Sequence, residues 1–496
     1  MYARSPQHTC CFAKRKKGAV SFIALMKVVS AVRTWLILLT LVSLAPQISC
    51  WVFAYKQSPL AISVPADYPS IQAAIDHASP GDTVSVSAGL YYERVTVNKP
   101  ITLAGEGKEA VIDGSNAGTI IQVTADNVKV TGFRLQNTGW KWGRAGVEVY
   151  RADNCVVENN VVFLTCHQIR LVESHGSRVA GNVVSAPGDP FPQSAYGVWL
   201  ENCTDCVVVN NNVSNNIGGI HFVGADNCAA IGNYVFQNSQ GVRLYSPCVN
   251  SRIVGNTVFN NTNDGMLVAL PDNTTFAQNR FVHNNFINNS QPFIGDLEGC
   301  VWDNGYEGNY WTAYTGQDVD HDGIGDTPHS FGEEQDRYPL MGRFSWFEVS
   351  TRGKTYGVEL VCDFAVRNLL YGQRDESNQS AITLSVENAA AEPWFCRLSF
   401  STELLIRPYT LEVDGGTSLS ATLNELPRSN STHIFLYIAH SGPTTTIALL
   451  GTGTAEDQAL PIPYFVVAAV LASGIVAAVL MFRRRGRKRN VERTSQ

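Results

Sequence analysis

The chain has 496 residues, of which only 16% are charged, and its formal net charge is −6. Residues 1–50 and residues 483–496 each hold seven basic residues, and together they hold one acidic residue, Glu492. Residues 51–482 therefore carry 23 basic and 42 acidic residues, a net charge of −19. Phosphate binding needs clustered lysine and arginine, so this acidic body excludes nucleic acid as a partner and fits a surface domain that meets neutral glycans or cations.

Residues 1–50 predict a signal peptide or a signal anchor. Four basic residues at 14–17 precede an apolar stretch at 35–44, which is the order found in secretory signals. No clear small-x-small cleavage site follows, so the cleaved and the uncleaved form both stay open. Either form places the body of the protein outside the cytoplasm.

The middle of the chain contains a repeat of about 22 residues. Six aligned segments share an asparagine followed two positions later by an apolar residue. These asparagines are Asn160, Asn182, Asn211, Asn233, Asn256 and Asn284, at intervals of 22, 29, 22, 23 and 28 residues. A second short strand in each repeat begins at Gly146, Gln168, Gly197, Gly219, Gly241 and Gly265. Short strands at this period predict a β-solenoid over residues 60–312, in which each coil pairs with the next.

The recurring asparagines have a structural explanation. Equivalent residues of adjacent coils stack about 4.8 Å apart, so a buried asparagine at a turn can bond the asparagines above and below it. A second column, Asn216, Asn238, Asn261 and Asn289, marks another turn. We interpret both columns as scaffold, and Cys155, Cys206 and Cys228 as inward packing.

These repeats resemble the parallel β-helix repeats of the pectin-lyase-like superfamily, in particular those of the NosD-like family of periplasmic proteins linked to copper-enzyme maturation. The segment 64–107 is similar to the start of that family. The resemblance covers about residues 60–340 and implies a right-handed helix. In it, Ser70 caps a short helix over 71–78 that closes the open end of the solenoid.

A copper role is implied by the resemblance but not supported by the residues. The extracytoplasmic body holds only Met266 and Met341 as thioether ligands. Its histidines are scattered, with no close pair at ligand spacing apart from His321 and His329. Soft-metal handling needs more sulfur and imidazole than this.

One outward column of the second strand set is the candidate ligand-binding site. Strand alternation points the first and third residues after the strand start inward and the second outward. The outward residues are Glu148, Arg170, Trp199, His221 and Arg243, followed by Leu267. The loop 140–142, Trp-Lys-Trp, comes just before the column. We expect one exposed stripe that suits sugar binding better than bond cleavage, although an ordinary solvated face is equally compatible with the pattern.

Residues 313–345 contain a candidate calcium loop that closes the solenoid. Four aspartates form D-x-D-x-D-G-x-x-D, and Ile324 is placed to add a backbone carbonyl. The aspartates are Asp318, Asp320, Asp322 and Asp326. The spacing matches an EF-hand-type loop up to the ninth position, whereas His329 replaces the glutamate of the twelfth. The pattern predicts structural Ca²⁺, with a solvated acidic loop as the alternative.

The remaining segments predict a stalk and an anchor. Residues 347–454 show alternating strands of about eight residues, which indicate a small β-sandwich where Cys362 and Cys396 could form a bridge. Residues 464–482 are apolar and predict one transmembrane helix. The basic tail at 483–496 then lies in the cytoplasm.

The sequence thus predicts an all-β, membrane-anchored protein of the cell surface. The leading interpretation is a binding or structural role, with a polysaccharide or cell-surface glycan as partner. The alternatives are a polysaccharide lyase or glycoside hydrolase and a NosD-like accessory factor in copper-enzyme maturation. Catalysis stays open, with binding favoured because the outward column holds no carboxylate pair.

Overall fold

The computed structural model describes residues 59–186, 195–245, 247–269, 276–291, 293–294, 300–332, 334–374, 379–389, 393–416 and 421–452. The predicted signal segment, transmembrane helix and basic tail lie outside these residues. Within them, no helix combines the length and the apolar character needed to cross a membrane.

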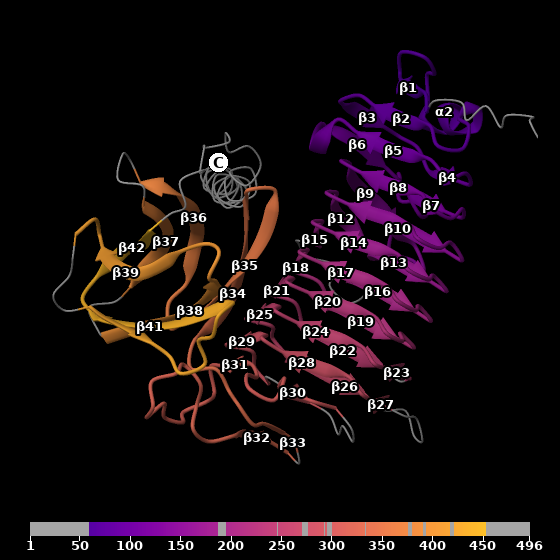
Figure 1. Ribbon diagram of the computed structural model, residues 1–496. Coiled ribbons are helices and arrows are strands. Elements are labelled where there is room, and N and C mark those ends of the chain that lie inside the picture. Colours follow the sequence, from indigo (N-terminus) through magenta and orange to yellow (C-terminus); the bar gives the residue numbers. More distant parts are fainter. Residues whose placement is uncertain are drawn as a thin grey trace, which may run out of the picture. The chain divides into compact units, whose positions relative to one another are not determined.

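Three parallel sheets build the predicted solenoid (Figure 1). The first sheet contains β1 (Ala61–Val64), β2 (Thr83–Val86), β5 (Thr102–Gly105), β8 (Lys129–Thr131), β11 (Val156–Glu158), β14 (Arg178–Ala180), β17 (Val207–Val209), β20 (Ala229–Ile231), β24 (Arg252–Val254) and β28 (Arg280–Val282). The second sheet contains β3 (Gly89–Tyr91), β6 (Ala110–Asp113), β9 (Arg134–Gly139), β12 (Val161–Thr165), β15 (Val183–Ser185), β18 (Asn212–Ser214), β21 (Tyr234–Phe236), β25 (Thr257–Phe259), β29 (Asn285–Ile287) and β31 (Tyr310–Trp311). The third sheet contains β4 (Val95–Val97), β7 (Ile121–Val123), β10 (Ala145–Tyr150), β13 (His167–Val172), β16 (Tyr196–Glu201), β19 (Gly218–Val223), β22 (Gln240–Tyr245), β26 (Asp264–Ala269) and β30 (Phe293–Ile294).

Shorter elements complete the solenoid. They are the 3-10 helix η1 (Gly107–Glu109), the parallel pair β23 (Cys248–Val249) and β27 (Phe276–Ala277), and the antiparallel pair β32 (His329–Phe331) and β33 (Glu334–Asp336). The core consists mainly of inward valine, isoleucine and leucine, β-branched residues in particular being favoured by a pleated and fully covered surface. Cys155, Cys206 and Cys228 belong to this core, as predicted.

The asparagine columns form continuous hydrogen-bonded ladders. The side-chain amide of each asparagine from Asn160 to Asn284 donates to the side-chain oxygen of the next, over 2.9–3.1 Å. The ladder continues to Asn309 and ends at the carboxylate of Asp336, which accepts the Asn309 main-chain N–H at 2.7 Å and its side-chain amide at 3.2 Å. Burial raises the pKa of Asp336 to about 6. The second predicted column, Asn216 to Asn289, makes the same contacts.

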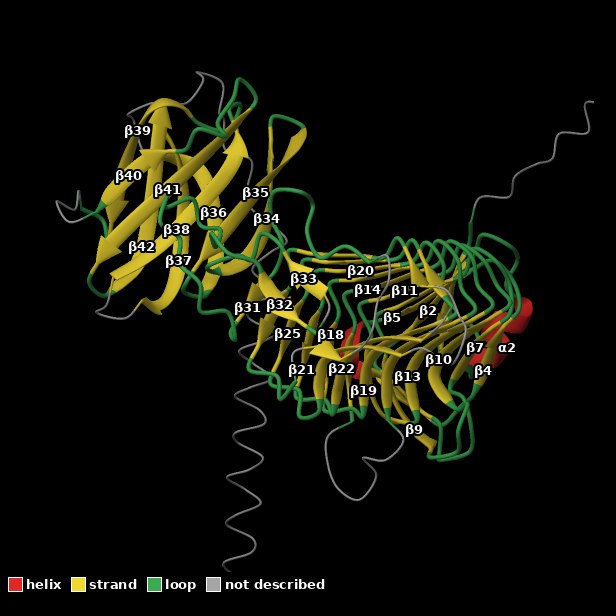
Figure 2. Cartoon of the chain, turned by 90° about the horizontal axis from the view of Figure 1, so that it is seen from below, coloured by secondary structure: helices red, strands yellow, loops and turns green. Residues whose placement is uncertain are grey.

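A short helix covers the N-terminal end of the stack. Helix α2 (Ile71–His77) starts at Ser70, whose hydroxyl accepts the Ala73 N–H at 3.3 Å, as predicted. At the other end of the helix, the Lys99 ammonium donates to three main-chain carbonyls, including that of Ala78 at 2.9 Å. Figure 2 shows α2 beside the first strands, so the apolar end of the solenoid is covered.

Two antiparallel sheets follow in the range predicted for a sandwich. One contains β34 (Arg343–Thr351), β35 (Lys354–Cys362), β38 (Pro393–Ser401), β41 (His433–Ser441) and β40 (Thr422–Glu425). The other contains β36 (Val366–Arg374), β37 (Gln379–Ala389), β42 (Thr444–Thr452) and β39 (Ile406–Val413). Residues of both sheets, such as Leu360 and Leu384, pack in one apolar cluster. Cys362 and Cys396 lie opposite each other in β35 and β38 and form a disulfide.

Candidate functional site

The outward column of the third sheet has the predicted register. Successive parallel strands pair Glu148 with Arg170, Arg170 with Trp199, Trp199 with His221, and His221 with Arg243. Their inward neighbours Val147, Ile169, Val198, Ile220 and Val242 are fully buried in the solenoid core. The alternation read from the sequence is therefore confirmed.

The column is not the exposed stripe that the sequence predicted. Glu148 is 8% exposed and His221 only 1%, whereas Arg170, Trp199 and Arg243 are half-buried. The prediction was wrong because bulky side chains stand on both sides of the column and on the preceding loop. Pointing away from the coil axis does not expose a side chain when its neighbours on the same face are aromatic.

Three neighbouring side chains and two members of the column form an aromatic cluster over the third sheet, defined as Trp142, His167, Tyr196, Trp199 and His221. The Trp142 ring lies edge-on to His167, Tyr196 and Trp199, with centroid distances of 4.7, 5.4 and 5.5 Å. The Tyr196 ring stacks on His167 at 5.4 Å and contacts His221 at 5.2 Å. His167 and Tyr196 were missed in the sequence, although both occupy the position just before the strand starts used to align the repeats.

Gly218 makes the room in which the His221 ring lies. A Cβ atom on Gly218 would come within 2.2 Å of His221 Nε2 and 2.7 Å of Tyr196 Cδ1. Gly218 pairs with Tyr196 across the coils, so any larger residue there would push both rings out of the cluster. The cluster thus depends on a small residue at one point of an otherwise bulky column.

Charged residues of the column are paired with one another. Arg170 donates through Nη1 to Glu148 and through Nη2 to Glu201, both at 2.7 Å. Trp199 Nε1 donates to the same Glu201 oxygen at 3.3 Å. On the other side of Trp199, Arg243 lies 3.5 Å from the Asp264 carboxylate and donates to the Tyr245 hydroxyl. Burial raises the pKa of Asp264, although Arg243 acts in the opposite direction.

Buried polar atoms without a hydrogen-bond partner concentrate at this site. In the described part of the chain they include both ring nitrogens of His167 and of His221, Nε of Arg170 and of Arg243, and Oδ1 of Asp264. Burial, reinforced by Arg170, lowers the pKa of His167 to about 3; burial and Arg243 likewise lower that of His221. Both imidazoles are therefore neutral near pH 7. An unsatisfied buried polar group costs about 1–3 kcal/mol, so this concentration marks a site rather than ordinary packing.

The acidic loop brings together three of its four aspartates. One carboxylate oxygen of each of Asp318, Asp320 and Asp322 lies within 4.8 Å of the others. Burial raises the pKa values of Asp318 and Asp322, and the Asp320 charge adds to both effects. A divalent cation would relieve this repulsion with oxygen ligands of the preferred kind, so the three residues fit a calcium site.

Asp326 lies outside this group, whereas the Ile324 backbone carbonyl, the atom predicted as a ligand, stays a prediction. The Asp326 carboxylate accepts the Val319 N–H at 2.7 Å and is not part of the three-carboxylate group. The Ile324 side chain packs in a small apolar cluster with Leu340 and Phe344. This packing fixes the loop against the strand β34 that follows it.

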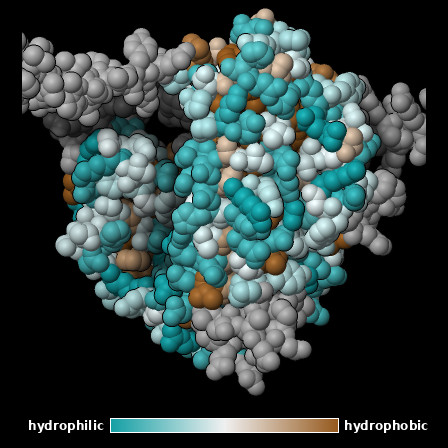
Figure 3. All heavy atoms as spheres, turned by 90° about the vertical axis from the view of Figure 1, so that its right-hand side faces the viewer, coloured by the Kyte–Doolittle hydropathy of each residue, from teal (hydrophilic) through white to brown (hydrophobic). Residues whose placement is uncertain are grey.

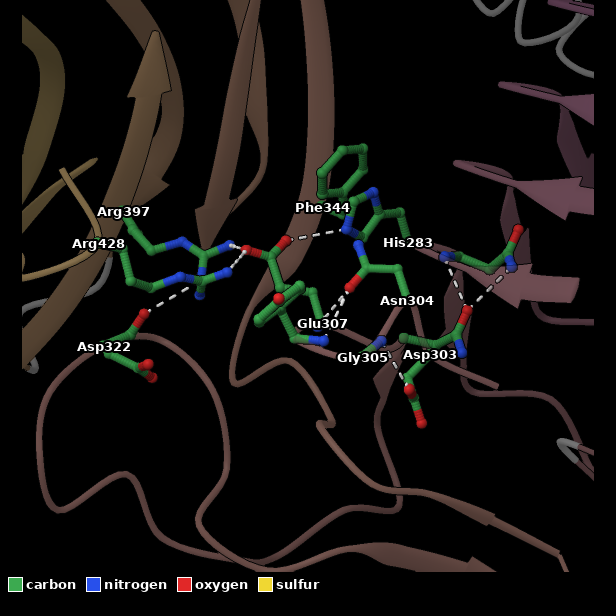
Figure 4. Close-up of polar contacts among 12 residues, drawn as sticks. His283, Asp303, Asn304, Gly305, Glu307, Asp322, Phe344, Arg397 and Arg428 are labelled. Atoms are coloured by element: carbon green, nitrogen blue, oxygen red, sulfur yellow. Dashed lines mark hydrogen bonds and ion pairs between the residues drawn. The ribbon is translucent and has the colours of Figure 1, made fainter. Parts of the chain in front are cut away.

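A buried carboxylate joins the end of the solenoid to the first antiparallel sheet (Figure 4). Glu307 contacts Arg397 at 3.1 Å, Arg428 at 3.0 Å and His283 at 2.9 Å. Arg397 also donates to the Asp322 carbonyl of the acidic loop at 3.1 Å. Burial alone would raise the pKa of Glu307, but these partners lower it from its usual 4.5 to about 2. This joint could not be predicted from the sequence, because Arg428 lies 121 positions after Glu307.

Comparisons with known proteins agree with this fold. Residues 75–216 and 187–285 match the family model of NosD, described as a periplasmic copper-binding protein. A curated relative, the cell surface glycoprotein of Methanothermus fervidus, is 23% identical over 429 residues, which span 73% of this chain and 69% of the relative.

Similar solved structures are far more distant. The Dettilon tailspike protein gp208 is 10% identical, with a TM-score of 0.34 over 79% of this chain and 94% of its own. The alginate lyase from Paenibacillus sp. str. FPU-7 is 14% identical, with a TM-score of 0.33 over 49% of this chain and 97% of its own. At these scores they carry no argument about activity.

Residues 75–285 of the parallel solenoid thus match the NosD family model, in agreement with the resemblance seen in the sequence. The relative is named a cell surface glycoprotein and the family is described as periplasmic, so both names refer to proteins outside the cytoplasm.

The Glu307 joint predicts a pH-dependent stability. The depressed pKa of Glu307 means that its contribution, about 3 kcal/mol, is complete above pH 4.5 and is lost as the pH falls from 4.5 towards 2. Glu307→Gln should therefore lower the free energy of unfolding by about 3 kcal/mol at pH 7, and the difference from the unmodified protein should shrink below pH 4.5. Chemical denaturation across this pH range measures it.

The matched control is Glu403→Gln, which breaks an exposed ion pair with Lys354. It should change the stability by less than about 1 kcal/mol. Equal effects of the two substitutions at pH 7 would contradict the role assigned to Glu307.

Proposed function

We propose that the protein binds a saccharide chain along the third sheet, at the aromatic cluster around Trp199. The observation that carries this proposal is the pairing of aromatic faces with unsatisfied buried hydrogen-bonding groups on one surface. Sugar rings offer apolar C–H faces for stacking and hydroxyls for hydrogen bonding, so they match both features. Strands spaced about 4.8 Å apart repeat these contacts along the axis, which suits a polymer. The surface relative is compatible with this role.

One face of the molecule has the hydrophilic character that suits a hydrated ligand. Figure 3 shows a largely hydrophilic face with isolated apolar side chains, and no broad apolar patch among the described residues in view. A protein partner held by an apolar interface would need such a patch.

Catalysis receives less support than binding. A glycosidase needs one carboxyl group free to donate a proton and a second one to act on the sugar. Here Glu148 and Glu201 both bind the Arg170 guanidinium, and Asp264 lies against Arg243. The carboxylates of the site thus hold its arginines in place.

Copper handling, named in the description of the family, also receives less support. Within the described ranges, the one group of three or more candidate metal ligands is Asp318, Asp320 and Asp322. Carboxylate oxygens are hard ligands that suit Ca²⁺ and Mg²⁺ rather than copper.

Trp199→Ala tests the saccharide site. A glycan array with the purified protein identifies the ligand, and calorimetry then measures its affinity. The substitution should weaken binding at least tenfold, about 1.4 kcal/mol, because the stacking surface is lost. Trp346→Ala is the control, since Trp346 lies in β34 and is 53% exposed. Binding that is equal in both variants would contradict the site.

We also propose that the acidic loop binds Ca²⁺ and orders the end of the solenoid. A chelator should lower the melting temperature, because Asp318, Asp320 and Asp322 then repel one another without a cation. Asp320→Ala should abolish the response to chelator. Melting curves of the unmodified protein that superpose with and without chelator would sink the proposal.

Residues 464–482 are proposed to anchor the protein in a membrane, with residues 483–496 in the cytoplasm. Protease added to intact cells should then remove the body and spare a reporter fused after Gln496. Digestion of that reporter would show the opposite orientation.

A further inference from the structure

We infer that the ligand of the Trp199 site is an uncharged saccharide, and that the site rejects uronic acid polymers. This inference rests on the proposed saccharide binding and names its substrate class. It follows from the charge balance of the site, from the kind of hydrogen bonding that its unpartnered atoms need, and from the charge of the surrounding body.

Both arginines of the site are already paired with carboxylates, so neither is available to bind an acidic sugar. Three carboxylates, Glu148, Glu201 and Asp264, stand against the two guanidiniums of Arg170 and Arg243, so the paired groups carry a net charge of −1. His167 and His221 are buried and neutral and add nothing.

Arg170 is already saturated by acids. Both of its Nη atoms bind carboxylates at 2.7 Å, so a uronate carboxylate would have to displace Glu148 or Glu201 from it. The displaced glutamate would then be left half-buried without its partner, which costs more than the exchange returns. Acid recognition usually relies on an arginine whose fork is free to take the ligand, and this one is not.

The basic residues at the rim do not change the balance at the centre. Arg144, on the loop before β10, donates through Nη1 to the carbonyls of Asn116 and Thr138. Lys141 on the same loop is exposed, where water and salt screen its charge.

The unpartnered atoms need a partner that both donates and accepts. A neutral imidazole has one N–H donor and one acceptor nitrogen, so His167 and His221 together present two of each. Nε of Arg170 and of Arg243 adds donors, and Oδ1 of Asp264 adds an acceptor. A hydroxyl group serves both kinds, whereas a carboxylate or sulfate accepts only. The mixture fits the hydroxyls of a neutral sugar.

Trp142 is the exposed member of the cluster. It lies edge-on to His167 and is 57% exposed. Gly139 and Gly143, on either side of the loop, have φ of 75° and 83°, which are left-handed values open to glycine. A sugar ring that replaces Trp142 against Tyr196 and Trp199 would reach the histidine nitrogens beneath.

The body of the protein adds a long-range effect in the same direction. Residues 51–482 carry a net charge of −19, which repels polyanions before any contact is made.

A pair of ligands that differ only in charge tests the inference. Oligogalacturonate and its carboxyl-reduced counterpart have the same linkages and length, and an alginate oligosaccharide with its reduced form gives a second pair. Calorimetry with the full-length protein should show at least tenfold tighter binding of the reduced, uncharged member. Its affinity should change less than twofold between 50 and 500 mM salt, because no ion pair forms with the ligand. Glu201→Gln, which frees one Arg170 Nη, should narrow the preference.

The outcomes separate the inference from the proposed function. Tighter binding of a uronate than of its reduced form would overturn the inference and leave saccharide binding standing. Failure of both pairs and of a neutral glycan array would overturn saccharide binding itself. Neutral binding that falls steeply with salt would also contradict the inference, since the ligand would then depend on a charge that the site is argued to lack.

Discussion

The structure depends on one constraint, the fixed spacing of equivalent residues in consecutive coils. The buried asparagine ladder holds equivalent residues of consecutive coils at this spacing. Each Oδ1 accepts both the main-chain N–H and the side-chain amide of the asparagine one coil earlier, as Asn211 does for Asn182. The Asn211 amide returns a bond to the Val179 carbonyl of that earlier coil. A slip of one residue would break these contacts and turn the valines of every strand outward.

That spacing also produces the site. Because the coils are in register, Glu148, Arg170, Trp199, His221 and Arg243 are stacked at strand separation, too close for wide rings to lie side by side. The rings tilt instead, and His221 uses the space above Gly218. Burial then follows from crowding on the outer face, and it neutralises the histidines and forces the ions to pair. The chemistry of the site is thus a consequence of the solenoid geometry.

Features that repeat from coil to coil or depend on neighbouring residues could be predicted from the sequence, and the other features could not. Period, register, inward valines and both ladders arise from contacts one coil apart, which leave a repeat in the sequence. The cap at Ser70 could be predicted because it is a local contact, with the Ala73 N–H three residues on. The exposure of the outward column leaves no such repeat, because Trp142 comes from an irregular loop and Tyr196 lies just before the aligned strand start. The Glu307 joint leaves no trace either, since Arg397 in β38 and Arg428 in the turn between β40 and β41 pair with Glu307 across a large separation in the chain.

The most direct measurement is the unfolding free energy of the purified Asn211→Leu variant, which keeps the number and branching of the side-chain heavy atoms and removes the ladder contacts. Asn211 is 1% exposed, and its loss leaves donors and acceptors of two neighbouring coils without partners. The stability should fall by at least about 3 kcal/mol. Asn263→Ala, an exposed asparagine with one bond to Ser239, should change it by less than about 1 kcal/mol. Equal stabilities of the two variants would contradict the central role of the ladder.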